Sequence, residues 1–392
     1  MDPRLNPYAP GAGTPPPELA GRDDLIERAA VALDRIRAGR AEKSLILIGL
    51  RGVGKTVLLN RIMLDSEARG IHCIRLEAPE GRSLPAMLAP ALRAALIKLD
   101  RGAAAGNLTK RALGALAGFI SAFRVKYGDI EVAVEAPPEK GLADSGDLEV
   151  DLADLLAAVA EAARERGTAA VLFIDELQYV PEEQLAALIT ALHHCAQRQL
   201  PITLVGAGLP QLVGQMGRAK SYAERLFEFP EVGPLDMAAA QQALTAPAAK
   251  EGAAFKPDAL AEILQQTQRY PYFLQEWGKH AWAAADSSPI TVDDIHVATR
   301  TALADLDASF FRVRFDRLTP TEKNYLRAMA ELGAGPHKSG DISAQMGRTV
   351  QSLGPTRSAL IAKGMIYSPQ HGDTAFTVPL FDGFMKRTMP LG

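Results

Sequence analysis

Short apolar runs recur between residues 44 and 229 and alternate with segments whose apolar positions follow a helical period. The runs at residues 45–48 and 169–174 are unbroken and the run at 202–205 is interrupted only by Thr203, and each is followed by a glycine or an acidic residue. Runs of this length are typical of strands buried on both faces of a sheet. Because helical segments separate them, the pattern predicts an α/β fold with a doubly wound parallel sheet.

The pattern changes after residue 235, where the strand-like runs stop. Four helices are expected at residues 236–250, 257–268, 272–285 and 291–306, with prolines near the breaks. They predict a helical lid with a linker over residues 236–318. Residues 319–392 are expected to form a helix, a helix-turn-helix and a two-stranded wing, an order typical of a winged-helix domain.

The first apolar run leads into a glycine-rich segment with a specific spacing. Gly49 is followed by Gly54, Lys55 and Thr56 in the pattern G-x-x-x-x-G-K-[ST], between a predicted strand and a predicted helix. In that context the loop's N–H groups converge on a phosphate, Lys55 reaches the β- and γ-phosphates, and the Thr56 hydroxyl binds Mg²⁺. The alternative is a glycine-rich turn that matches by chance. The predicted nucleotide-binding residues of this loop are Gly49, Leu50, Arg51, Gly52, Val53, Gly54, Lys55, Thr56 and Val57.

A pair of acids, Asp175 and Glu176, ends the second buried run. Two acids at the end of a strand are a weak signal alone, but they follow the phosphate loop in the order that a nucleotide-hydrolysing site requires. Asp175 is expected to hold Mg²⁺ together with Thr56. Glu176 is expected to orient and activate the attacking water. The predicted activity is therefore the hydrolysis of ATP, with ATP and Mg²⁺ as cofactors and with Glu176 and Lys55 in catalytic roles.

Composition narrows the class of protein. The chain has 392 residues, 47% of them hydrophobic, so it is long enough for two or three domains with full cores. Its two cysteines are far apart and lie in apolar or helical surroundings, which favours a reducing compartment. No run of 18 or more apolar residues and no apolar signal core occur, so the sequence predicts a cytoplasmic protein without a membrane span.

Positive charge is concentrated in the last segment. Residues 319–392 hold eight Lys or Arg and five Asp or Glu, so they carry +3 in a chain whose net charge is −3. This distribution suits contacts with the phosphates of double-stranded DNA. The alternative is a module that binds a protein partner. The candidate DNA-binding residues are Arg348, Arg357 and Lys363.

Two further segments stand out by composition. Residues 1–18 carry six prolines and are expected to form an extended arm without a helix or a central strand. Residues 101–126 contain basic residues and no acid, within an expected insertion at 101–147 of a nucleotide-binding core that spans 19–235. The insertion is either a basic flap that touches DNA or a partner, or a segment packed on the core with solvated charges.

With both motifs in place, the chain resembles AAA+-related ATPases of the origin-recognition and archaeal-ATPase type, close to the STAND signalling NTPases. The resemblance implies that Gly21 and Arg22 lie on the adenine side of the nucleotide, and that Pro271 belongs to a lid segment near it. It also implies that Arg225 is an arginine finger acting in a neighbouring subunit, which would make the protein a homo-oligomer. From the residues alone, Gly21 and Arg22 equally fit an ordinary helix lead-in, and Arg225 equally fits a surface ion pair.

The sequence departs from that resemblance at three places. Arg269 stands where the lid segment is expected to have a glycine. The strand that ends at Gly206 lacks an obvious polar sensor, unless Thr203 or Gln211 serves. These two departures predict slow hydrolysis. Pro355 falls inside the expected recognition helix, which speaks against sequence-specific reading of bases.

Two hypotheses for the function follow. The first is an ATP-driven switch whose winged helix binds DNA in a nucleotide-dependent way. The second is a STAND-like regulatory NTPase whose C-terminal segment binds a protein partner.

Overall fold

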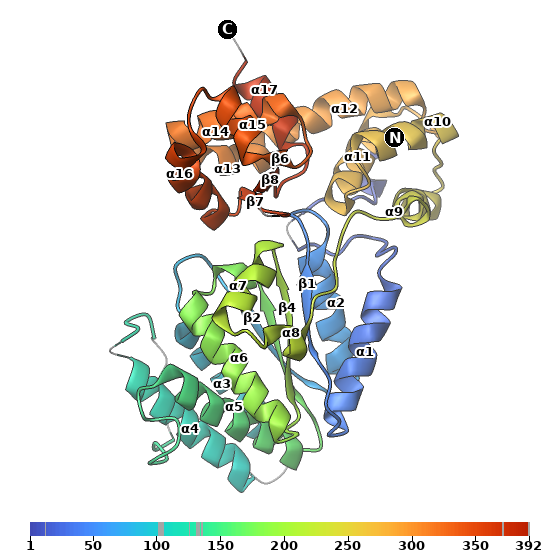
Figure 1. Ribbon diagram of the computed structural model, residues 1–392. Coiled ribbons are helices and arrows are strands. Elements are labelled where there is room, and N and C mark those ends of the chain that lie inside the picture. The colour runs from blue at the N-terminus through green and yellow to red at the C-terminus, as the bar shows by residue number, and fades with distance from the viewer. Residues whose placement is uncertain are drawn as a thin grey trace. The chain divides into compact units, whose positions relative to one another are not determined.

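The computed structural model describes residues 1–11, 13–100, 106–124, 126–130, 134, 136–370 and 372–390 (Figure 1). Parts of the predicted insertion at 101–147 therefore lie outside the described residues. The chain forms two compact units. The α/β unit consists of Asp23–Ile48 and Lys55–Glu231, and the helical unit consists of Met1–Arg22, Gly49–Gly54 and Val232–Gly392. None of the helices in the described ranges combines the length and the apolar character that crossing a membrane requires.

The α/β unit is built on a five-stranded parallel sheet of order β2-β3-β4-β1-β5. Its strands are β1 (Ser44–Ile48), β2 (His72–Glu77), β3 (Ala170–Asp175), β4 (Ile202–Gly208) and β5 (Phe227–Glu228). Every residue of β1, β3 and β4 is buried, as expected for strands covered on both faces. The predicted α/β class and parallel sheet are thus confirmed, and β4 lies between β1 and β3.

Helices cover both faces of this sheet (Figure 1). On one face, α1 and α2 pack on each other and on the strands; on the other, α5 and α6 pack on each other and on β4. The bounds are α1 (Asp23–Arg37), α2 (Lys55–Ala68), α3 (Leu84–Asp100), α4 (Asn107–Phe123), α5 (Leu148–Glu165), α6 (Glu182–Gln197), α7 (Gln211–Ala219) and α8 (Ala223–Leu226). Helix α4, from the predicted insertion, packs on α3 and α5 and buries Leu116, Phe119 and Phe123 in the common core.

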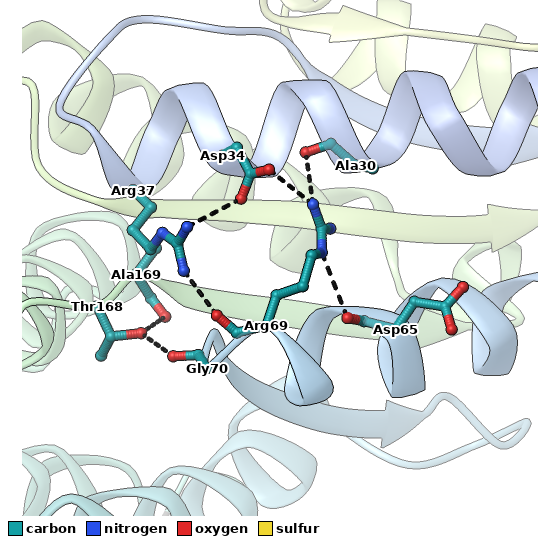
Figure 2. A network of polar contacts seen from close by, with 8 residues as sticks. All are labelled: Ala30, Asp34, Arg37, Asp65, Arg69, Gly70, Thr168 and Ala169. Carbon is teal, nitrogen blue, oxygen red and sulfur yellow. Dashed lines mark hydrogen bonds and ion pairs between the residues drawn. The ribbon is translucent and has the colours of Figure 1, made fainter.

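A polar network fixes the end of the α/β unit where α2 finishes (Figure 2). The guanidinium of Arg69 donates to the carboxylate of Asp34 at 2.8 Å and to the Ala30 carbonyl at 3.2 Å, both on α1. Arg37 of α1 donates in return to the Arg69 carbonyl at 2.6 Å. The Thr168 hydroxyl, just before β3, donates to the Gly70 carbonyl at 2.8 Å. These bonds tie α1, the end of α2 and the approach to β3 together, so α2 is held firmly at the end remote from Lys55.

The helical unit contains the four helices predicted after residue 235. They are α9 (Met237–Lys250), α10 (Pro257–Gln266), α11 (Pro271–Ala284) and α12 (Val292–Leu306). Prolines at the first position of α10 and α11 suit a helix start, because their missing N–H would have no partner there. A π-helical turn (Asp307–Phe311) and α13 (Arg312–Asp316) continue from α12.

The C-terminal segment combines helices with a small sheet. Its elements are α14 (Pro320–Leu332), β6 (His337–Lys338), α15 (Ser339–Gln345), α16 (Val350–Ala362), β7 (Ile366–Tyr367), β8 (Asp373–Phe376) and α17 (Phe381–Thr388). The strands form an antiparallel sheet of order β6-β8-β7. Thr319 caps α14, at the boundary expected from the sequence. Pro355 lies inside α16 without delaying its start at Val350.

One hydrophobic core joins the predicted lid to the C-terminal segment. Phe311, on the π-helical turn, packs 6.5 Å from Phe273 of α11 and 5.3 Å from Phe384 of α17, measured between ring centroids. All three side chains are fully buried or nearly so. The two segments therefore share apolar burial rather than forming separate cores.

The N-terminal arm also packs on the helical unit. The ring of Tyr8 is buried against Gly278 of α11, where an added Cβ would come within 2.6 Å of it, and the Tyr8 hydroxyl donates to the Leu244 carbonyl at 2.5 Å. The prediction that the arm contains no helix was wrong in one detail, since Pro3–Leu5 forms a single 3-10 turn. Proline presets φ for such a turn, and Asp2 caps it by accepting from the Arg4 N–H.

Candidate active site

The loop between β1 and α2 requires its glycines for two different reasons. Gly52 and Gly54 have φ of 82° and 88°, a left-handed conformation that a side chain disfavours. Gly49 has no such φ, but a Cβ there would lie 2.1 Å from the Val232 carbonyl oxygen. The two glycines of the G-x-x-x-x-G spacing thus reflect one close approach and one left-handed backbone conformation, and Gly52 between them adds a second such conformation.

Main-chain and side-chain bonds hold this loop within the helical unit. The N–H of Tyr272, in the first turn of α11, donates to the Gly52 carbonyl at 3.1 Å. The N–H of Arg51 donates to the carbonyl of Thr377, which follows β8, at 3.0 Å. The guanidinium of Arg22 donates to the Val53 carbonyl at 3.3 Å. Two segments predicted to lie near a nucleotide, Arg22 and the start of α11 at Pro271, therefore do contact or border the phosphate loop.

The backbone before Pro271 accounts for one departure of the sequence from the family resemblance, the arginine at position 269 in place of a glycine. Arg269 has a φ of 61°, so this position does adopt the left-handed conformation for which a glycine is expected. Its carbonyl accepts from the Leu235 N–H at 3.1 Å. The backbone shape of the segment is thus kept with an arginine, at a cost in conformational strain.

Lys55 and Thr56 begin α2, and Thr56 reaches across the α/β unit to the end of β3. Its hydroxyl donates to Oδ2 of Asp175 at 2.6 Å. Lys55 and Asp175 are 8% and 9% exposed, so two charged side chains are buried at this edge of the sheet. Burial raises the pKa of Asp175, while the Thr56 hydroxyl acts in the opposite direction. A hydroxyl and a buried carboxylate side by side are hard oxygen ligands, and they fit Mg²⁺.

Glu176 follows directly and has an unusual backbone. Its φ is 54°, rare for a non-glycine residue, and its N–H donates to Oδ1 of Asp175 at 2.8 Å. Its carboxylate accepts a hydrogen bond from the side-chain amide of Gln178. The amide oxygen of Gln178 accepts in turn from the Leu209 N–H, just beyond β4, at 3.1 Å. Gln178 was missed by sequence reasoning, and its only local signal is its place two residues after Glu176.

Arg225 and Gly21 are two further residues predicted to serve the site. Arg225 lies near the end of α8, directly before β5, and its side chain is exposed. Gly21 has a φ of 65°, and a Cβ there would come within 2.6 Å of Ala239, so packing against α9 alone accounts for the glycine. The roles of Arg225 as an arginine finger and of Gly21 beside a base stay predictions.

The three candidate DNA-binding residues differ in what their side chains do. Arg357 donates to the hydroxyls of Thr374 and Ser368, both at 3.0 Å. Lys363 pairs with Glu322 at 2.7 Å. Arg348 is exposed beside the start of α16. Two of the three cations thus serve contacts within the C-terminal segment.

Comparisons with known proteins agree with the geometry of the α/β unit. Residues 18–205 match the family model of the AAA ATPase domain, and residues 308–385 match that of a domain of unknown function, DUF8462. No curated protein matches the chain in sequence. The first match spans the segment that contains α1, β1, α2, β2, β3 and most of β4, so this part of the chain is similar to an AAA ATPase domain.

The chain was also compared with solved structures. A Walker-type ATPase of Pyrococcus abyssi is 15% identical with a TM-score of 0.61, over 97% of this chain and 99% of that chain. The Orc1 protein of Aeropyrum pernix in complex with DNA is 15% identical over 94% and 93% of the chains, with a TM-score of 0.47. The RuvB Holliday junction branch migration motor of Thermotoga maritima is 15% identical over 95% of both chains, with a TM-score of 0.44. Scores below 0.5 support no conclusion about this chain, so of these three structures the first supports the fold.

Proposed function

We propose that this protein is a molecular switch that binds ATP with Mg²⁺ and hydrolyses it slowly. The observation that carries the proposal is the bond between Thr56 and Asp175, which unites the two expected metal ligands although they come from different motifs. Lys55 and the loop amides would bind the phosphates, with the N-terminal end of α2 adding its favourable dipole. Glu176 would take a proton from the attacking water. Mg²⁺, when bound, neutralises charge on the phosphate oxygens.

The bonds of the phosphate loop support a switch rather than a metabolic enzyme. Gly52 is bonded to α11 and Arg51 to the residue after β8, so the loop touches both the helices after residue 235 and the C-terminal segment. A nucleotide that rearranges this loop would bind with different affinity to the conformation in which these bonds are made and to the conformation in which they are broken. Such a differential interaction is what a ligand needs to shift a conformational equilibrium.

The test of this proposal is ATP turnover with Mg²⁺, with and without duplex DNA. Lys55→Ala is the blank, because it removes the cation expected at the β- and γ-phosphates. Turnover above this blank supports the proposal. Wild-type turnover no higher than that of Lys55→Ala would refute it.

We infer double-stranded DNA as the partner of the C-terminal segment. Its order of helix, strand, helix, helix, strand, strand and helix, with a three-stranded sheet, is the order of a winged helix and supports this inference. The local excess of basic residues supports it as well. DNA affinity should change between a non-hydrolysable ATP analogue and no nucleotide, and it should fall with salt. No nucleotide effect and no salt slope would exclude DNA.

A protein partner is the second candidate, and one observation favours it. The exposed positions of α16 carry no charge, since they are Val350, Gln351, Ser352, Pro355, Ser358 and Ala362. A helix that enters a DNA groove usually presents several basic or amide side chains to it, and Gln351 is the one exposed residue of α16 of that kind. The STAND-like alternative also expects assembly, through Arg225 in a neighbouring site. It is tested by the mass of the wild type and of Glu176→Gln with ATP, and monomers in both cases would exclude assembly.

A further inference from the structure

We propose that Gln178 is a positioning residue that orients Glu176 for ATP hydrolysis and links it to the end of β4. This inference rests on the proposed function, because it assigns a role within the same reaction. Gln178 lies on a 3-10 turn, η2 (Leu177–Tyr179), and is 7% exposed. Its side-chain amide donates to the carboxylate of Glu176 and accepts from the Leu209 N–H at 3.1 Å. It therefore bridges the expected base and the segment that follows β4.

The orientation of the Gln178 amide follows from its partners. A backbone N–H can only donate, so the amide oxygen must face Leu209. The NH₂ group then faces Glu176, whose ionised carboxylate can only accept. A glutamine is one of the few side chains that satisfies both partners at once. Gln178 holds the carboxylate of Glu176 through its Oε2 atom. Gln178 is thus a third group that fixes the orientation of the general base, as catalytic bases commonly require.

The glycines at the end of β4 make room for this bridge. A Cβ at Gly208 would lie 3.0 Å from Oε1 of Gln178 and 2.5 Å from a methyl of Leu212. A Cβ at Gly206 would lie 2.3 Å from a methyl of Leu177. Both glycines thus leave the space that η2 occupies, and β4 has no side chain at these positions that could serve as a polar sensor.

The sensors suggested by the sequence have other surroundings. The Thr203 hydroxyl bonds with that of Ser44 at 2.9 Å, between the second residue of β4 and the first of β1. That pair lies at the end of the strands opposite to Asp175. Gln211 lies beyond β4, at the start of α7, and its amide oxygen is buried without a partner in the described part of the chain. Gln178 is instead the side chain that joins the end of β4 to Glu176.

The orientation of Glu176 also depends on a backbone that needs support. With a φ of 54°, Glu176 adopts a conformation that costs energy unless its surroundings hold it. Its N–H is bonded to Asp175 and its carboxylate to Gln178, so both ends of the residue are fixed. Losing the second bond would remove this support of the carboxylate while the bond between the Glu176 N–H and Asp175 stays in place.

Gln178→Glu is the sharpest test. The new side chain has the same shape and still accepts from Leu209, but it offers no donor and places a second carboxylate beside Glu176. Gln184→Glu is the matched control, because Gln184 is 8% exposed and its Oε1 likewise accepts a backbone N–H, that of Leu84, at 2.6 Å. The two variants differ in whether the amide contacts Glu176.

Steady-state ATP turnover is measured for both variants, with binding of a non-hydrolysable ATP analogue in parallel. We expect Gln178→Glu to lower kcat about tenfold or more at neutral pH with KM and binding little changed. Gln184→Glu should leave kcat, KM and binding close to those of the wild type. Gln178→Leu, which also lacks the donor, should lower kcat with KM and binding little changed.

Normal kcat in Gln178→Glu, an equal loss of analogue binding, or an equal loss of kcat in Gln184→Glu would each overturn the positioning role. Those results leave ATP hydrolysis itself intact, so they refute this inference alone. If the wild type hydrolyses ATP no faster than Lys55→Ala, the proposed function fails, and the role of Gln178 fails with it.

Discussion

The hydroxyl of Thr56 donates a hydrogen bond to the carboxylate of Asp175 at 2.6 Å, although the two residues are 119 positions apart. They come from α2 and β3, and β4 separates β3 from the strand that precedes α2. The bond therefore depends on the whole strand order and not on local sequence. It brings together the two oxygen groups that we expect to bind a cation, the Thr56 hydroxyl and the Asp175 carboxylate. Burial of that carboxylate is unfavourable without a cation.

Asp175→Asn should abolish Mg²⁺-dependent turnover and yet stabilise the protein in the absence of metal. Burial raises the pKa of Asp175, so its favourable contribution is present below the unfolded pKa and is lost as pH rises through the folded pKa. At pH 7.5 the wild type holds a buried carboxylate that the variant lacks. Thermal unfolding without Mg²⁺ or nucleotide should show Tm higher by about 2 °C or more in the variant. A lower Tm at that pH would contradict the sign of this effect.

Glu176→Gln should retain ATP binding and lose turnover. The substitution keeps the shape of the side chain but removes the base that accepts a proton from water. We expect kcat to fall by about 10²–10⁴-fold while the affinity for ATP stays within a few-fold of the wild type. Pre-steady-state phosphate release and nucleotide binding measure the two effects separately. Unimpaired phosphate release would remove Glu176 from the role of base.

Gly49→Ala should destabilise the protein through a clash. Its new Cβ would lie 2.1 Å from the Val232 carbonyl oxygen, a backbone atom that cannot turn away. We expect a loss of about 1–3 kcal/mol in the free energy of unfolding. Gly233→Ala is a suitable control, because a Cβ there meets no atom within 4 Å and its φ is outside the left-handed range. Equal stability of the two variants in urea unfolding would contradict this prediction, because it would mean that the backbone at Gly49 moves to accommodate the added methyl group.

Local sequence patterns predicted most of the helices and strands, because these elements depend on residues that are close together in the sequence. The run before Gly49 is β1, the acids Asp175 and Glu176 follow β3, and the four helices after residue 235 begin and end within a few residues of their expected bounds. In each case a short window holds the whole signal: apolar continuity, helical period, or a proline at the first helical position.

Features that depend on distant contacts could not be predicted in this way. The bridge through Gln178 exists because glycines some thirty residues later leave room for it, which spacing around Glu176 does not reveal. The packing of Tyr8 on Gly278 is similar, since proline content indicates an extended arm but not where it docks. Charge counts likewise did not reveal that Lys363 is paired with Glu322 inside the C-terminal segment.

The unfolding free energies of Arg357→Ala and Arg348→Ala should distinguish a basic side chain that stabilises the fold from one that is exposed to a partner. Arg357 donates to Thr374 and Ser368 and to the Asp373 carbonyl, so its loss removes bonds that tie α16 to the β7–β8 connection and to β8. We expect Arg357→Ala to cost about 1–2 kcal/mol in unfolding free energy. Arg348→Ala should leave stability within about 0.5 kcal/mol, because this side chain is exposed.

DNA binding by the same two variants decides the partner. If double-stranded DNA is the partner, Arg348→Ala should weaken binding to all sequences alike and reduce the slope of log affinity against log salt by about one. Fluorescence anisotropy with a short duplex, between about 50 and 200 mM salt, measures this slope. Unchanged affinity and slope in Arg348→Ala would instead favour a protein partner, because Arg357 and Lys363 are engaged in contacts within the C-terminal segment.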